Sequence, residues 1–176
     1  SNAVDLSYSS SASTTNGATG AASTAMGGGT TASGSRSTAM GGGTTASGSR
    51  STAMGSGTEA SASYSTAMGF FTTASGIFST AMGNVTTASG AGSTAMGYNT
   101  EASGYYSTAM GFETTASASY SKAMGRNTTA SDYGSLVIGQ FNSSGSSATS
   151  ATSFSTANTA FVIGNGTGTG VDASDA

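Results

Sequence analysis

The sequence of 176 residues predicts an all-β fold, a parallel β-roll (solenoid) whose coils are fourteen residues long. Every methionine of the chain falls on one fourteen-residue period, at Met26, Met40, Met54, Met68, Met82, Met96, Met110 and Met124. The unit around each of them reads Ser-Thr-Ala-Met-Gly, two variable residues, Thr, then Thr or Glu, Ala-Ser-Gly and two more variable residues, with few exceptions. A side chain confined to one position of a strict period is a structural part of a repeat. One coil of the roll therefore corresponds to one unit.

The composition supports stacked coils and disfavours the other fold classes. Hydrophobic residues make up 35% of the chain, alanine is by far the commonest of them, and 28 residues are glycine, so an ordinary core of large side chains is excluded. Only 6% of residues are charged, which lacks the charge excess of disordered chains. A flexible Ser/Gly linker has no reason to keep methionine at a fixed position. Fourteen residues are two heptads, but frequent glycine and the absence of flanking charges exclude a coiled coil.

Each unit contains two short strands, Ser-Thr-Ala-Met-Gly and Thr-x-Ala-Ser, separated by two corners. Because side chains alternate between the faces of a strand, Met82 is expected on one face and Ser79, Ala81 and Gly83 on the other. A coil this short encloses a narrow interior, so we expect Ala81, Ala88 and their equivalents to point inward. The methionines then point outward and form an apolar stripe on the order of 35 Å long. A soluble monomer rarely exposes such a stripe, and this predicts a symmetric assembly.

The chain divides into five segments. Residues 1–3 look like the scar of tag removal, and residues 4–22 are interpreted as a degraded N-terminal coil or cap in which Ala12 takes the methionine position. Regular repeats occupy residues 23–134. Residues 135–166 are divergent repeats, with a loop inserted near residues 143–153, and residues 167–176 form a tail. No apolar run approaches a membrane span and no signal segment opens the chain, so we expect a mature fragment.

These units resemble the YadA-like head repeats (haemagglutinin-like repeats) of trimeric autotransporter adhesins. The likeness is strongest at Leu136-Val137-Ile138-Gly139 and Phe161-Val162-Ile163-Gly164, and it extends from about residue 9 to residue 166. It implies a left-handed parallel β-roll in each subunit and three rolls side by side in a homotrimer. It also implies that the methionine column faces the trimer, where the family usually has isoleucine or valine. The predicted trimer interface consists of Met26, Met40, Met54, Met68, Met82, Met96, Met110, Met124, Ile138 and Ile163.

The resemblance also implies a function and a location. Members of the family act in virulence as heads that bind host matrix proteins such as collagen, or host cells, and they aggregate bacteria with one another. They stand on the surface of Gram-negative bacteria. This chain lacks the neck, the coiled-coil stalk and the C-terminal outer-membrane anchor, so we expect a head fragment whose link to the membrane is missing.

The side chains argue against catalysis. The chain contains no histidine and no cysteine, and none of its seven carboxylates forms a close pair in repeat register. A serine without a base is a surface or turn residue. The four basic residues provide no basic surface for nucleic acid. We therefore expect no enzyme activity, no cofactor, no metal site and no nucleic-acid partner.

The glycine triplets Gly27-Gly28-Gly29 and Gly41-Gly42-Gly43 could suggest a phosphate-binding loop or a calcium-binding repeat array. A phosphate loop requires a lysine and a following helix, and a calcium-binding repeat array requires an aspartate in every turn. Neither is present. Glycine at tight solenoid corners is the better interpretation.

The variable corners are the candidate ligand surface. From residue 64 onward they carry large apolar residues, including Ile77 and Val85, which cannot enter a narrow interior. Two roles stay open for them, packing between subunits and a ligand-facing patch. Arg36 and Arg50 occupy one position in successive coils, and an acidic or sulfated ligand would neutralise them, although solvated arginines need no ligand. The candidate ligand surface consists of Arg36, Arg50, Phe70, Phe71, Phe78, Tyr98, Tyr105, Tyr106, Phe112 and Tyr120.

Two alternatives to an adhesin head remain at this point. A trimeric phage tail-fibre segment would share the roll and the trimer. An ice-binding solenoid is suggested by the threonine column at Thr30, Thr44 and Thr58, but the same-face partner of each is alanine where a second threonine is wanted.

Overall fold

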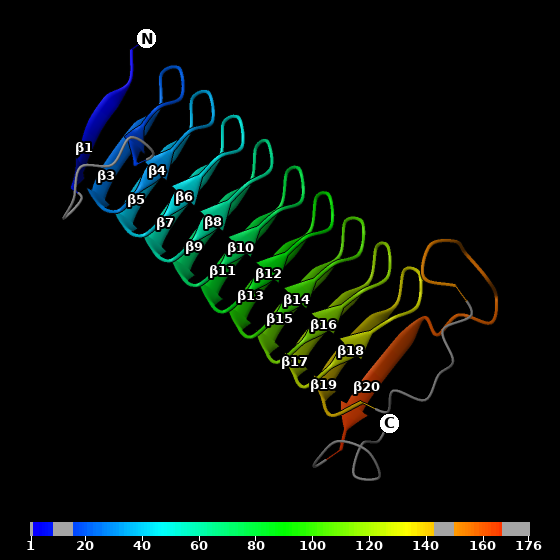
Figure 1. Cartoon of the computed structure of the whole chain (residues 1–176). Helices are drawn as coiled ribbons and strands as arrows, with labels where there is room; N and C mark the ends of the chain where they lie inside the picture. The colour runs from blue at the N-terminus through cyan, green and yellow to red at the C-terminus, as the bar shows by residue number, and fades with distance from the viewer. Residues whose placement is uncertain (1, 9–15, 143–149, 167–176) are drawn as a thin grey trace.

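The computed structural model describes residues 2–8, 16–142 and 150–166, which form a β-solenoid of stacked coils (Figure 1). Each regular coil contributes one strand of five residues and one of two residues. The five-residue strands form an eleven-stranded sheet and the two-residue strands form a nine-stranded sheet. The predicted all-β parallel solenoid is confirmed. No helix in the described part of the chain is long and apolar enough to span a membrane.

The strands pair in chain order within each sheet. The eleven-stranded sheet contains β1 (Val4–Tyr8), β3 (Thr24–Gly28), β5 (Thr38–Gly42), β7 (Thr52–Ser56), β9 (Thr66–Phe70), β11 (Thr80–Asn84), β13 (Thr94–Tyr98), β15 (Thr108–Phe112), β17 (Lys122–Arg126), β19 (Leu136–Gln140) and β20 (Phe161–Asn165). The nine-stranded sheet contains β2 (Gly17–Ala18), β4 (Thr31–Ala32), β6 (Thr45–Ala46), β8 (Glu59–Ala60), β10 (Thr73–Ala74), β12 (Thr87–Ala88), β14 (Glu101–Ala102), β16 (Thr115–Ala116) and β18 (Thr129–Ala130).

The repeat sets the register of both sheets. All pairs are parallel, and Met82 of β11 lies between Met68 of β9 and Met96 of β13. Ala88 of β12 likewise lies between its equivalents in the neighbouring coils. Equal residues therefore stack in columns along the whole solenoid.

Small side chains fill the interior. Ala81 and Ala88 are completely buried, as are their equivalents in the other regular coils, and this agrees with the expected inward orientation. Columns of serine and threonine join them, represented by Ser79 and Thr86. In several coils the serine hydroxyl donates to a carbonyl three residues earlier, as Ser37 does to Gly34 at 2.7 Å. In the regular coils, residues 23–134, the interior is thus a stack of alanine, serine and threonine, and Val137 continues the alanine column in the coil that follows.

Burial of the threonine column removes the basis of the ice-binding alternative. Thr30, Thr44 and Thr58 are at most 1% exposed. Because these hydroxyls face the interior, they cannot form the flat outer face that ice recognition would need.

The expectation that Gly83 faces the interior with Ala81 is wrong. Gly83 is exposed and has a φ of 122°, and the equivalent glycines that follow the other methionines also have a positive φ. The strict alternation of faces applies to an extended backbone. It ends here because the strand has already begun to bend into the corner.

The expectation that Ala12 takes the methionine position of the first coil is also wrong. Strand β1 pairs with β3 so that Leu6 lies beside Met26. Ala12 itself is outside the described residues. Leu6 is apolar and 64% exposed, and it continues the methionine column at the N-terminal end.

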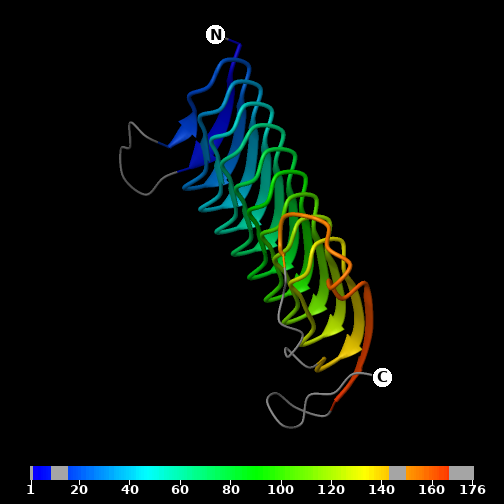
Figure 2. The same cartoon turned by 90° about the vertical axis from the view of Figure 1, so that its right-hand side faces the viewer.

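The C-terminal end departs from the regular coils. Strand β20 pairs with β19 so that Ile163 lies beside Ile138. Residues 143–149, most of the predicted loop, and the tail 167–176 lie outside the described residues. The carbonyls of Ser150 and Ala151 accept the N–H groups of Tyr133 and Ser119, so the segment before β20 lies along the last coils (Figure 2).

Candidate binding surfaces

Each coil turns twice, and its two corners form two rows along the solenoid. The first-corner row begins with the last residue of each five-residue strand and continues into the corner, and it includes Phe70 and Phe71. The second-corner row follows the two-residue strands and includes Tyr105 and Tyr106. The two rows lie at opposite ends of the five-residue strands, as the loops above and below them in Figure 1 show. The predicted ligand surface is therefore two separate surfaces.

The predicted residues divide between the rows. The first-corner row holds Phe70, Phe71, Tyr98 and Phe112, and the second-corner row holds Arg36, Arg50, Phe78, Tyr105, Tyr106 and Tyr120. All ten are exposed. None of them enters the interior.

One position in each corner has a left-handed backbone. In the first-corner row it is glycine in early coils, such as Gly43 with a φ of 61°, and a large residue later, such as Phe71 (48°) or Val85 (54°). In the second-corner row Gly92 (66°) and Tyr106 (50°) take the same position. A residue with a Cβ loses roughly 1–2 kcal/mol in this conformation and glycine does not. The chain thus keeps large exposed side chains where glycine would avoid strain.

In the second-corner row, side chains of successive coils stack on one another. The guanidinium of Arg50 lies 5.2 Å from the ring centroid of Tyr64 and donates a 2.7 Å hydrogen bond to its hydroxyl. The ring of Tyr64 stacks on Phe78 with centroids 5.0 Å apart. Arg50 is thus held by an aromatic neighbour in the next coil.

Further along the same row, four tyrosines form one cluster. Tyr120 contacts Tyr105, Tyr106 and Tyr133, with centroid distances of 5.7, 6.1 and 5.4 Å. Tyr105 and Tyr106 meet edge to face at 4.5 Å. The pKa of Tyr105 is raised, first because ionised Tyr106 would repel its negative charge and second because of a side-chain hydrogen bond with Tyr106. We call these four residues the tyrosine cluster.

The first-corner row carries aromatic pairs and one cation. Phe70 and Phe71 meet edge to face at 4.4 Å, and Tyr98 stacks on Phe112 at 4.9 Å. The guanidinium of Arg126 lies 5.9 Å from the ring centroid of Phe112 and 5.1 Å from that of Phe141. Phe70 and Phe71 belong to one corner, whereas the contacts of Phe112 with Tyr98 and Arg126, and of Arg126 with Phe141, join neighbouring coils along this edge.

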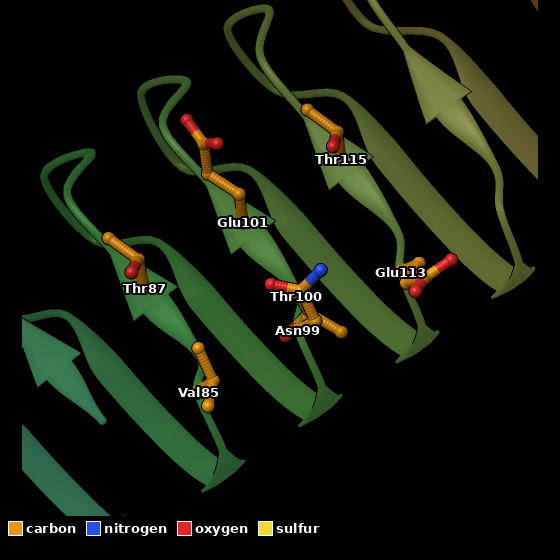
Figure 3. Close-up of a pocket in the computed structure, with 7 residues that line it drawn as sticks. All are labelled: Val85, Thr87, Asn99, Thr100, Glu101, Glu113 and Thr115. Carbon is orange, nitrogen blue, oxygen red and sulfur yellow. The ribbon is translucent and has the colours of Figure 1, made fainter. Parts of the chain in front are cut away.

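A hollow of about 210 Å³ opens beside this row (Figure 3). Its lining comes from the first corners and from strands β12, β14 and β16, and consists of Val85, Thr87, Asn99, Thr100, Glu101, Glu113 and Thr115. The first-corner side chains form one wall, and the residues of the short strands form the other. In the first three regular coils, the position that corresponds to Val85, Asn99 and Glu113 is glycine, so this wall has no side chain there.

The hollow is rich in hydrogen-bond acceptors. It contains the carboxylates of Glu101 and Glu113, and an oxygen of Glu113 accepts a 2.6 Å hydrogen bond from the Asn127 amide. Such a lining suits a ligand that presents donor groups. In the described ranges 2–8, 16–142 and 150–166, no three His, Cys, Asp or Glu side chains gather closely enough to hold a metal ion.

The methionine column lies on the outer face of the eleven-stranded sheet. Met26 is 39% exposed, and Met40 to Met124 are half-buried. Ile138 is half-buried, and Ile163 at the C-terminal edge is 41% exposed. The column is a continuous partly exposed stripe, as an interface would require.

Besides Ile77 and Val85, which the sequence places at corners but which are not among the ten candidates, the contacts of four further residues place them in the two rows. Tyr64 and Tyr133 belong to the second-corner row, and Arg126 and Phe141 to the first-corner row. The fourteen-residue period could have found them, because Arg126 stands one unit after Phe112 and Tyr64 one unit after Arg50.

The sequence of the chain matches the model of one protein family. The model of the YadA head domain repeat (2 copies) matches residues 18–44, 46–72, 74–100, 102–121 and 116–142, more than half of the chain. No curated protein matches the chain.

Proposed function

Since the chain belongs to the YadA head family, we propose that it is the binding head of a trimeric autotransporter adhesin, displayed on a Gram-negative cell and anchored in the outer membrane by other parts of the protein. Its role is attachment to host matrix of the collagen type or to host cells, with autoaggregation as a second use. It acts by binding and not by catalysis.

The methionine column supports the trimeric state. An apolar stripe on one sheet face is suited to burial against copies of the same chain around a threefold axis. Sedimentation should therefore give three times the mass of the chain. Replacing Met82 by Asp places three like charges at the axis, and each unpaired buried charge costs several kcal/mol. The variant should dissociate, and a wild-type monomer at micromolar concentration would contradict the trimer.

The left-handed corner positions carry the ligand-binding role. Large exposed side chains stand at Phe71, Val85 and Tyr106 where glycine occupies the same position in other coils. Strain kept at such positions is typical of functional sites. Exposed aromatic side chains are also the residues that dominate binding energy at protein interfaces.

Replacement of strained aromatic residues by glycine tests this role. Phe71→Gly removes one aromatic group from the first-corner row, and Tyr106→Gly removes one from the second-corner row. Both should leave the melting temperature unchanged or higher, because the strain is relieved. Binding to immobilised collagen or to host cells should fall for the row that contacts the ligand. Phe154→Ala, at a highly exposed residue outside both rows, is the control. Unchanged attachment of both glycine variants would refute the ligand role of the rows.

A further inference from the structure

We propose that the tyrosine cluster is an oxidative cross-linking site, at which a one-electron oxidant of the peroxidase and hydrogen peroxide class couples tyrosines of neighbouring coils into dityrosine. Tyr120 is the ring shared by the cross-coil pairs. The product is a covalent link between coils of one chain.

The cluster brings phenol rings together across coil boundaries. Tyr120 lies within 6.1 Å, centroid to centroid, of Tyr105 and Tyr106 in the preceding coil and of Tyr133 in the following one. Tyr105, Tyr106 and Tyr120 are 43–49% exposed, and Tyr133 is half-buried. Exposure gives an oxidant access and leaves the side chains free to turn ring edges toward one another.

The coupling balances with hydrogen peroxide as the only oxidant. Each of two phenols loses one electron and one proton to give a phenoxyl radical. The radicals join through ring carbons adjacent to the oxygens, and the two ring hydrogens then move to the oxygens and restore both phenols. One hydrogen peroxide accepts the two electrons and two protons and becomes two waters. The chain loses two hydrogen atoms in each link.

The other tyrosines with described rings have different neighbours. Tyr64 stacks on Phe78 and accepts a hydrogen bond from Arg50, and Tyr98 stacks on Phe112. Phenylalanine has no phenol hydroxyl from which a phenoxyl radical forms. Both residues are about as exposed as Tyr105, Tyr106 and Tyr120. Tyr64 lies in the second-corner row, as the cluster does, and is the matched control, whereas Tyr98 lies in the first-corner row and is a control at the other edge.

A link at Tyr120 joins residues thirteen to fifteen positions apart, which belong to neighbouring coils. Tension along the solenoid separates coils, so the link resists the motion by which this fold would be pulled open. It also restricts the unfolded chain, as a disulfide does. Cross-linked protein should therefore melt at a higher temperature than untreated protein.

The test treats the purified protein with a haem peroxidase and limiting hydrogen peroxide. Dityrosine fluorescence should appear, and intact mass should fall by two hydrogens. Trypsin separates residues 51–122, which contain Tyr120, from residues 127–176, which contain Tyr133. A Tyr120–Tyr133 link joins these peptides, whereas a link to Tyr105 or Tyr106 lies within the first. Methionine sulfoxides add oxygen and are counted separately.

Variants separate the cluster from tyrosine reactivity in general. Tyr120→Phe keeps the ring and the packing and should remove the cross-coil links and most of the fluorescence, leaving only coupling between Tyr105 and Tyr106. Tyr64→Phe and Tyr98→Phe should match wild type. The proposal fails if no dityrosine forms, if Tyr120→Phe retains the wild-type yield, or if denaturing gels show links between chains instead of within them.

Discussion

A Cβ atom added to Gly83 would overlap the carbonyl oxygen of Gly97 in the next coil. The equivalent glycines after each methionine stand in the same relation to the coil that follows. Gly83 also has a φ of 122°, in the region that residues with a Cβ rarely adopt. Glycine therefore recurs after every methionine because successive coils approach too closely there for a Cβ atom, and not because the interior is narrow.

Gly83→Ala should strongly destabilise the roll. The added methyl group has no space beside Gly97, and the combined overpacking and left-handed strain amount to about 2–5 kcal/mol. The midpoint of denaturant unfolding measures the loss. Gly42→Ala is the control, because a Cβ there meets nothing within 4 Å, and it should change stability by at most about 0.5 kcal/mol. Equal losses for the two variants would contradict this assignment.

The sequence alone predicts the features that follow from periodicity. The stacking of Met82 and the corner positions of the aromatic residues come from the fourteen-residue period, and the inward orientation of Ala81 comes from strand alternation together with the narrow interior that so short a coil encloses. Gly83 was assigned to the wrong face because alternation assumes an extended strand. Leu6 was missed because it precedes Met26 by more than one unit. The division of the ligand surface into two edges depends on the path of the chain through each coil, which periodicity does not contain.

Ala81→Leu should test the narrow interior. Ala81 is completely buried among small residues, and the larger side chain costs about 1–3 kcal/mol by overpacking. The melting temperature should fall without selective loss of the proposed trimer. Met82→Leu, on the outer face one residue away, conserves volume and should change stability much less. A larger loss for Met82→Leu would mean that the two faces are reversed.

Val85→Gly should raise stability. Val85 is β-branched and exposed with a φ of 54°, so glycine removes about 1 kcal/mol or more of left-handed strain, partly offset by greater freedom of the unfolded chain. Ile77→Gly is the matched control, since Ile77 is similarly exposed but outside the set of residues with positive φ. It should lose about 0.5–1 kcal/mol. Opposite signs in thermal melts support the strain argument, and destabilisation of both variants would remove it.

Asn142 should protect the edge of the nine-stranded sheet. Its side-chain oxygen accepts the Thr129 N–H at 2.8 Å, and its amide nitrogen donates to the Thr129 carbonyl at 3.0 Å, so one side chain takes the place of a further strand beside β18. Asn142→Leu removes both bonds and should cost about 1–2 kcal/mol.

Asn142→Leu also leaves the backbone groups of Thr129 open to another chain, so light scattering should show more association on heating. Asn142→Asp separates the two bonds, because a carboxylate accepts the N–H but cannot donate to the carbonyl. Its melting temperature should lie between those of wild type and Asn142→Leu. If all three proteins melt and associate alike, the amide does not act as the edge cap.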